Sequence, residues 1–357
     1  MTRIAPLCHG LGLTLGLTLS GAAPALAHTL DEEIADCACD AACFTDEVQG
    51  LGCTTARFSF ESIGLPDASH TLMTGMTAHN QQFPRPHSYH FTLPRDPELA
   101  SHPSETRPGA IGVAVNGVPI FSPDTQGPVQ ASGRPVSAAE AGELDSCGGH
   151  AGRGDDYHYH RAPNCLIEEL GAEAVEQQLQ PIGYAADGFP ILALGWFDPD
   201  HDIEDKLDAC RGATDAAGRY FYNVEHDGDQ AVLDCFSGRE QRISRDGWSP
   251  RKDADGRDIV GIPVPMAVTA YSQQGSCQIM SGTLRDEQLA RPDGSIAHPA
   301  TVDGAIFWCS SSCYGHFIET RAAAPGRTLT FTAATAGCAE DFAPAHDNGF
   351  LAYRSAP

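Results

Sequence analysis

The stretch Ile111–Ile120 reads IGVAVNGVPI, and it returns as IGYAADGFPI at Ile182–Ile191 with six of ten positions identical. In both copies, short apolar runs flank an Asn-Gly or Asp-Gly pair. These dipeptides favour the tight turn of a β-hairpin, because both tolerate a positive φ angle. The repeated stretch therefore predicts a chain built from short strands linked by turns.

The similarity continues downstream of each hairpin at a constant offset of 63 residues. The offset aligns Leu144 with Leu207, Asp145 with Asp208, Cys147 with Cys210, Gly149 with Gly212, Tyr157 with Tyr220 and Tyr159 with Tyr222. Each copy ends at a cysteine, which gives two units at residues 111–165 and 182–235. A unit of this size buries too little apolar surface to be stable alone. We therefore expect two pseudo-repeated β units that pack together.

One helix is expected within this β pattern. Residues 166–180 read LIEELGAEAVEQQLQ, with apolar residues near helical spacing, and Pro181 ends the run. The predicted fold is mainly β with long loops, one clear helix at about 166–180, and disulfide staples. The expected parts are a signal peptide at 1–27, a cysteine-rich N-terminal cap at 28–54, a repeat-bearing domain at 55–240 and a C-terminal β-rich extension at 241–357.

Between the two hairpins lies the segment DDYHYHRAPNC, Asp155–Cys165. Its alternation of Tyr and His is typical of a strand, whose successive side chains point to opposite faces. His158 and His160 then share one face, and Tyr157 and Tyr159 share the other. Two imidazoles on one strand face are close enough to bind one ion.

The second unit serves as an internal control for these histidines. It keeps the aligned Asp, Cys, Gly and Tyr residues, but Ala213, Phe221 and Asn223 stand where the first unit has His150, His158 and His160. All three histidines are absent together, although the surrounding pattern persists. This joint loss indicates that they form one functional set, whereas the tyrosines and cysteines belong to the scaffold.

Three imidazoles suit a divalent transition metal, and the sequence does not distinguish copper from zinc. A set of three protein ligands leaves a coordination position open, which permits catalysis without requiring it. Metal-free use of the histidines, as the lining of a polar groove, is the alternative. A function from another class is a non-catalytic surface module whose aromatic residues around Tyr157 and Tyr159 contact a glycan or a protein partner.

Four residues are candidates for outer-sphere support of these imidazoles: Asp145, Asp187, Tyr157 and Tyr159. A turn or capping role for the two aspartates is an equally good interpretation, since Asp145 recurs as Asp208 and Asp187 aligns with Asn116. A weaker second metal candidate is Cys309, Cys313 and His316, whose two thiolates and one imidazole suit copper. In an oxidising compartment, disulfides are the competing explanation for these two cysteines.

The first residues indicate export. Arg3 precedes an apolar run, LGLTLGLTLS, and then APALA, which ends at Ala27. A positive start, a short apolar core and an Ala-x-Ala site define a secretory signal peptide, and no later run is long enough to span a membrane. We therefore expect a periplasmic or extracellular protein.

The charge and the cysteines agree with this compartment. The net charge is −25, and such a surface disfavours nucleic acid. Of the 13 cysteines, all but Cys8 lie beyond the expected signal, and an exported chain uses such residues mainly for disulfides. The cysteines expected to form disulfides are Cys37, Cys39, Cys43, Cys53, Cys147, Cys165, Cys210, Cys235, Cys277 and Cys338.

These motifs together resemble a known family. LDSCGGHAGRGDDYHYHRAPNCL, combined with IGVAVNGVPIF and IGYAADGFPI, is similar to the YHYH domain family of exported bacterial proteins. The resemblance covers roughly residues 55–240. Members of that family often carry histidines in the second unit as well, so this chain departs from the pattern there. The resemblance implies no particular activity, because the family's biochemistry is essentially unassigned.

Overall fold

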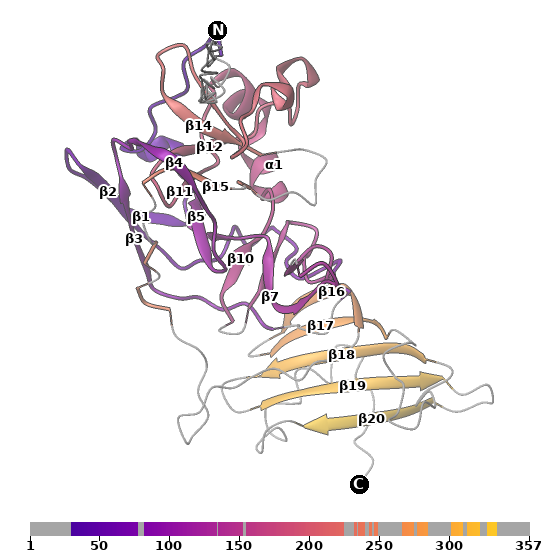
Figure 1. The fold of residues 1–357 in the computed structure, drawn as a ribbon. Coiled ribbons are helices and arrows are strands. Elements are labelled where there is room, and N and C mark those ends of the chain that lie inside the picture. Colours follow the sequence, from indigo (N-terminus) through magenta and orange to yellow (C-terminus); the bar gives the residue numbers. More distant parts are fainter. Residues whose placement is uncertain are drawn as a thin grey trace, which may run out of the picture.

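The structure is a computed structural model, and its described part is mainly β (Figure 1). It describes residues 30–77, 82–133, 135–152, 155–224, 232–233, 235–239, 243–244, 246–248, 266–274, 277–284, 301–309, 313–321 and 327–333. The expected signal peptide at 1–27 lies outside these residues. Within them, no helix is both long and apolar enough to cross a membrane.

The central feature is a sheet of eight short strands, in the order β13-β14-β12-β11-β5-β6-β10-β9. Its strands are β5 (Ala110–Ala114), β6 (Pro119–Phe121), β9 (Gly149–Ala151), β10 (Tyr157–Tyr159), β11 (Gly183–Ala185), β12 (Pro190–Leu192), β13 (Gly212–Thr214) and β14 (Tyr220–Asn223). The two predicted units occupy the two halves of the sheet.

Both halves of this sheet show the same strand order from its centre outward. The central pair β5 and β11 is antiparallel, a hairpin partner follows on each side, and the third strand then joins in parallel before an antiparallel edge strand. The two repeated decamers therefore lie side by side at the middle of the sheet. The strands of the histidine segment lie at one edge of it.

The predicted helix at 166–180 is present but broken. It consists of α1 (Asn164–Ala172), followed by the π-helical segment η2 (Glu173–Gln177). Gly171 has φ 77°, in the left-handed region that glycine adopts without steric strain, and it interrupts the helical backbone. Three single-turn 3₁₀ segments complete the helical content of the described part: η1 (Ala41–Cys43), η3 (Pro199–His201) and η4 (Glu204–Lys206).

Three small sheets surround the central one. The first is formed by β1 (Val48–Cys53), β2 (Arg57–Ser62) and β3 (Tyr89–Pro94), and two strand pairs are formed by β4 (Leu99–Glu105) with β15 (Cys235–Gly238) and by β7 (Asp124–Val129) with β8 (Pro135–Ser137). Because β1 lies in the predicted N-terminal cap and pairs with β2, the cap is continuous with the domain that follows it.

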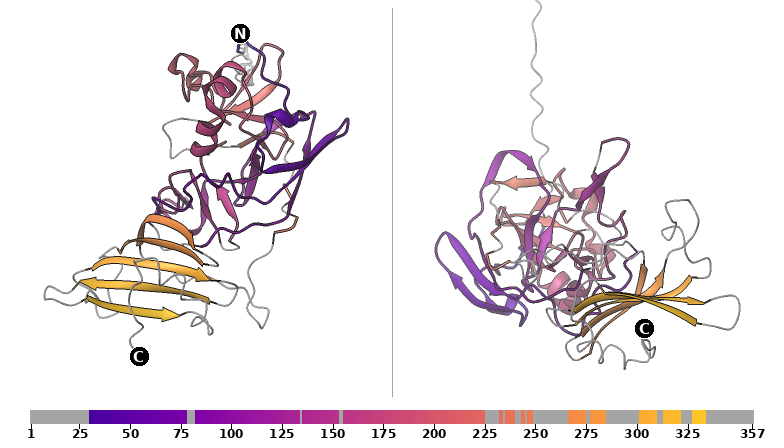
Figure 2. Two further views of the ribbon diagram at one scale, coloured as in Figure 1. Left: turned by 180° about the vertical axis from the view of Figure 1, so that it is seen from behind. Right: turned by 90° about the horizontal axis from the view of Figure 1, so that it is seen from below.

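The C-terminal sheet has five antiparallel strands in sequence order (Figure 2). They are β16 (Met266–Gln274), β17 (Cys277–Leu284), β18 (Thr301–Cys309), β19 (Cys313–Arg321) and β20 (Arg327–Ala333). Strand β16 contacts the domain, because Val268 exchanges backbone hydrogen bonds with Gly75 and Met76 and its side chain is buried in the main core.

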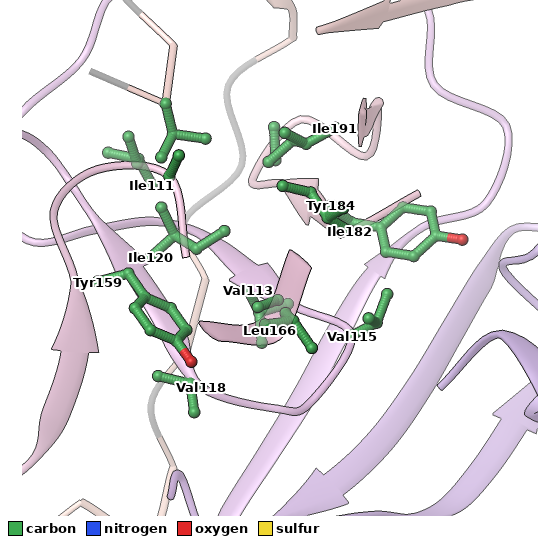
Figure 3. Packing of buried hydrophobic residues seen from close by; sticks show 14 of the residues in the cluster. Ile111, Val113, Val115, Val118, Ile120, Tyr159, Leu166, Ile182, Tyr184 and Ile191 are labelled. Atoms are coloured by element: carbon green, nitrogen blue, oxygen red, sulfur yellow. The ribbon is translucent and has the colours of Figure 1, made fainter. Parts of the chain in front are cut away.

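The main core combines buried side chains from both halves of the central sheet with others from β2, β3 and α1. Figure 3 shows side chains from both decamers packed in one cluster, among them Ile111, Val113, Ile120, Ile182 and Ile191, all essentially inaccessible to solvent. Each decamer therefore buries its apolar face against the other copy. This shared burial explains why neither unit needs to form a core alone.

Four disulfides staple the described part of the chain. They join Cys37 to Cys43, Cys39 to Cys53, Cys147 to Cys165 and Cys210 to Cys235. The last two close the two units in the same way, which accounts for the aligned cysteines in the sequence. Cys338 and the side chain of Cys277 lie outside the described part, so the predicted role of these two cysteines stays a prediction.

Candidate metal centre

The edge strand β9 and its antiparallel neighbour β10 bring the three predicted histidines together. In the register of β9 and β10, His150 lies directly opposite His158, and the amide of His160 continues the pairing by donating to the Gly148 carbonyl at 3.1 Å. Residues opposite each other in a sheet share a face, as do residues two apart on one strand. All three imidazoles therefore lie on one face of the sheet.

The imidazoles form a compact triangle. Their ring centroids are 4.8 Å apart for His150 and His158, 4.9 Å for His158 and His160, and 5.0 Å for His150 and His160. One potential ligand atom from each lies within 4.8 Å of the others, and the side chains of all three are buried. Among the described residues, this is the set of three or more such groups that could hold a metal ion.

The Nδ1 atoms of His158 and His160 each lie next to a backbone carbonyl oxygen. The Nδ1–H of His160 donates to the Ser122 carbonyl at 2.6 Å, and that of His158 donates to the Asp156 carbonyl at 2.9 Å. A donating Nδ1 fixes the neutral tautomer whose Nε2 carries a free lone pair. Outer-sphere oxygens of this kind orient metal-binding histidines.

His150 also has an oxygen atom near its Nδ1, but at a longer distance than a hydrogen bond. Its Nδ1 has no hydrogen-bond partner among the described residues, and it lies 3.8 Å from Oε2 of Glu143. Its Nε2 lies 3.2 Å from Nε2 of His160. Zinc–nitrogen bonds of about 2.05 Å in a tetrahedron hold two ligand atoms about 3.3 Å apart. The observed Nε2–Nε2 separation matches the spacing of two ligands on one ion.

Burial disfavours the charged form of His150 and His160. Burial lowers the pKa of His150 well below its usual range, with the neighbouring His158 and His160 adding to the effect. Burial, together with His158, lowers the pKa of His160 to about 3. The ring of Phe121 stacks on His158 with centroids 3.8 Å apart and closes one side of the triangle. Neutral imidazoles are the form that binds a metal ion.

Gly152 provides space for the His158 ring. A Cβ at this position would lie 2.6 Å from Cε1 of His158, closer than van der Waals contact allows. The aligned position in the second unit is Asp215, where no histidine ring needs the room. We expect Gly152→Ala to displace the His158 ring and to weaken metal binding by at least about tenfold, because ligand orientation controls affinity. Competition titration against a chromophoric chelator measures the change.

Thermal unfolding of the metal-free protein provides the control for that substitution. The melting temperature of the Gly152→Ala variant should stay close to that of the wild type, since the clash involves a ring that the metal-free fold can tilt. Unchanged metal affinity in a normally folded variant would show that the His158 ring takes no part in binding.

The comparison with known families gives one match. Residues 90–240 match the family model described as YHYH protein. This part of the chain is a YHYH domain. Its matched region contains both halves of the central sheet and all three histidines. No curated protein and no solved structure matches the chain.

In the second half of the YHYH domain, the positions that align with the three histidines carry residues that pack or hydrogen-bond within the fold. Ala213 and Phe221 lie opposite each other on β13 and β14, and they belong to a small buried cluster with Ile34 and Leu192. The side chain of Asn223 is satisfied by the backbone of Leu194 on both its donor and its acceptor side. This half therefore offers no imidazole set at these positions.

The sequence-predicted outer-sphere residues have other partners. The carboxylate of Asp145 accepts from the Tyr157 hydroxyl at 2.8 Å and from the backbone amide of Met73 at 2.8 Å. The carboxylate of Asp187 accepts from the Tyr222 hydroxyl at 2.6 Å, in the other half of the sheet. These hydrogen bonds join the aspartates to the tyrosine face, which agrees with the structural interpretation of both residues.

The tyrosine face is itself buried. Tyr157 and Tyr159 are inaccessible to solvent, and the hydroxyl of Tyr159 accepts from the Asn116 side chain at 3.1 Å. Because Asn116 aligns with Asp187, each half ties the last tyrosine of its strand to the turn of its hairpin. Tyr157 and Tyr159 therefore do not form an aromatic surface for a glycan or a partner.

Sequence reasoning missed the groups around the triangle: Phe121, Ser122, Glu143 and Asp156. Two of them act through backbone carbonyls, which every residue carries, so no residue type signals them. The weaker metal candidate at Cys309, Cys313 and His316 stays a prediction. Cys309 and Cys313 are register partners at the ends of β18 and β19, and the side chains of all three residues lie outside the described part.

Proposed function

We propose that the YHYH domain binds one divalent transition metal ion, copper or zinc, through Nε2 of His150, His158 and His160. The observation that carries the proposal is the buried triangle in which two Nδ1 atoms donate to carbonyl oxygens and the Nε2 atoms of His150 and His160 approach to 3.2 Å. Such a set supplies three ligands to an ion and leaves further positions for water or substrate.

A metal-free hydrogen bond is the competing account of the short Nε2–Nε2 distance. In that arrangement the Nε2–H of His150 donates to Nε2 of His160, and Nδ1 of His150 is left as a buried acceptor without a partner. An unsatisfied buried polar atom is unfavourable. Metal binding instead places the proton of His150 on Nδ1, on the side of Glu143, as in other carboxylate-supported histidine ligands.

The compartment forms part of the proposal. Four disulfides are typical of proteins that fold in an oxidising environment. We therefore infer that the protein acts outside the cytoplasm, where it binds or sequesters a metal ion. The open coordination position permits a reaction, and no substrate is assigned.

Elemental analysis of the full chain purified from a periplasm tests the proposal. We expect one copper or zinc ion per chain in the wild type and essentially none in the His158→Ala/His160→Ala variant. Copper-loaded protein should show nitrogen hyperfine coupling from three imidazoles in its electron paramagnetic resonance spectrum. Sub-stoichiometric metal in the wild type, or equal metal in both proteins, would contradict the proposal.

A further inference from the structure

A cavity lies in the half of the YHYH domain that has no histidine triangle. Its volume is about 560 Å³, which is in the range of small-molecule sites. Its walls come from residues 34–38, 95–99, 188–190 and 218–220, with the ring of Tyr184. It is therefore built by the N-terminal cap, a loop before β4, and the β11–β12 hairpin together.

Tyr184 is one of the residues that line this cavity, and its buried hydroxyl is unpartnered in the described part of the chain. The residue is 3% exposed, and its hydroxyl has no hydrogen-bond partner among the described residues. Its ring is held edge-on against Phe58 with centroids 4.8 Å apart, and in Figure 3 the hydroxyl points away from the core cluster. A buried hydroxyl without a partner is costly, and a polar ligand group in the cavity would remove that cost.

The cavity lining carries a small excess of negative charge. Its charged residues are Asp36, Asp96, Glu98, Arg95 and Arg219. Glu98 pairs with Arg239 at 3.2 Å, and Arg219 pairs with the buried Asp215 at 2.7 Å. Asp36 and Asp96 have no ion-pair partner among the described residues, whereas Arg95 keeps its charge and donates to the Thr54 carbonyl at 3.4 Å. The remaining two carboxylates and one guanidinium favour a cation over an anion.

Two further observations support a ligand that combines a positive charge with an apolar part. Burial raises the pKa of the Tyr184 hydroxyl, and the negative charge of Asp36 raises it further, so the hydroxyl stays protonated and its oxygen can accept a hydrogen bond. Leu99 lies at the cavity with 56% of its surface exposed, and Phe189 and Tyr220 meet edge-to-face in the wall. Hydrocarbon can pack on the leucine, and aromatic rings attract cations.

We propose that this cavity binds a small organic ammonium ion, whose N–H donates to Oη of Tyr184 while its carbon chain packs against Leu99. Asp36 and Asp96 supply the compensating negative charge. The site is separate from the histidine triangle and does not depend on a bound metal.

Isothermal titration of the full chain with n-hexylammonium chloride tests this site. We expect saturable one-to-one binding, with weaker binding of the neutral n-hexanol and none of the anionic hexanoate. Tyr184→Phe should weaken hexylammonium binding roughly tenfold, since a hydrogen bond to a charged group is lost. Asp36→Asn should also weaken it, whereas Asp205→Asn makes the same charge change at an exposed position outside the cavity and should have no effect.

Two controls separate this result from metal binding and from unfolding. The titration is repeated on the His158→Ala/His160→Ala variant, where an amine that bound at the metal would lose its site; we expect the affinity to be unchanged. The metal content of Tyr184→Phe should equal that of the wild type, which shows an intact fold. Hexanol binding as tightly as hexylammonium, full affinity in Tyr184→Phe, or no binding at all would overturn the inference.

Discussion

The variant His150→Ala/His158→Phe/His160→Asn will bind copper or zinc at least roughly 10³-fold more weakly than the wild type and will still fold. The loss follows because all three imidazole ligands are removed at once. The fold survives because these are the residues that the second half carries at the matching positions, Ala213, Phe221 and Asn223, where they are buried in the same kind of sheet edge.

The local contacts favour this choice over three alanines. Phe121 already stacks on the His158 ring with centroids 3.8 Å apart, so a phenyl ring at 158 retains an aromatic neighbour. Competition titration gives the metal affinity, and far-UV circular dichroism with thermal unfolding gives the state of the fold. Wild-type metal affinity in a folded variant would exclude the triangle as the metal site.

The reciprocal variant, Ala213→His/Phe221→His/Asn223→His, provides a matched control. It introduces three histidines into the second half, but Ile34 and Leu192 surround them with apolar groups, and Leu194 loses the hydrogen bonds of Asn223. We expect it to be destabilised and to gain no second metal ion. Two tightly bound ions per chain would show that histidines at these strand positions suffice without the outer oxygens.

Asp145→Ala will destabilise the metal-free domain by about 4 kcal/mol at pH 7. The carboxylate accepts from the backbone amides of Met73, Cys147 and Gly149 and from the Tyr157 hydroxyl, and all four donors would be left buried without an acceptor. Chemical denaturation in the presence of a chelator measures the loss.

Asp208→Ala is the matched comparison. Asp208 holds the corresponding turn of the second half and accepts from the amides of Cys210 and Gly212 and from the Tyr220 hydroxyl. It lacks a counterpart to the Met73 bond and is only partly buried, so the loss of stability should be smaller. Equal losses would mean that the link from Asp145 to Met73 contributes nothing.

The Asp145 effect will also depend on pH. Burial raises the pKa of Asp145 to about 6, against an ordinary value of 3.8, although its four hydrogen bonds act in the opposite direction. A raised pKa means that the folded state favours the protonated acid, so this contribution is complete below about pH 4 and is lost as the pH rises through 6. The difference in unfolding free energy between wild type and Asp145→Ala should therefore be larger at pH 4 than at pH 7, by roughly 2–3 kcal/mol.

The histidine triangle could be predicted because two local signals coincide there. Alternation placed His158 and His160 on one face, and their joint absence from the second unit separated them from Tyr157 and Tyr159. The position of His150 followed from the same alignment. The metal itself, and the common origin of the two units, stay predictions.

The outer oxygens and the helix break could not be predicted in this way. The carbonyl that orients His160 belongs to Ser122, 38 residues away in sequence, and its position depends on how β6 pairs with β10. Likewise, apolar spacing around Gly171 continues as if the helix were unbroken, because periodicity records side chains and not the φ angle of one glycine.

The apolar cluster of the second half has a consequence for the protein without metal. In the proposed function, the three buried histidines contribute little to folding before an ion binds, whereas a buried phenylalanine in the matching place contributes about 2–3 kcal/mol with or without the ion. The packing of the sheet edge around Phe221, Ile34 and Leu192 therefore stabilises the fold whether or not an ion is bound. The contribution of the edge around the histidines depends on the proposed ion. If the triangle binds an ion as proposed, the ion can leave and return without the domain having to refold, because both edges belong to one continuous eight-stranded sheet.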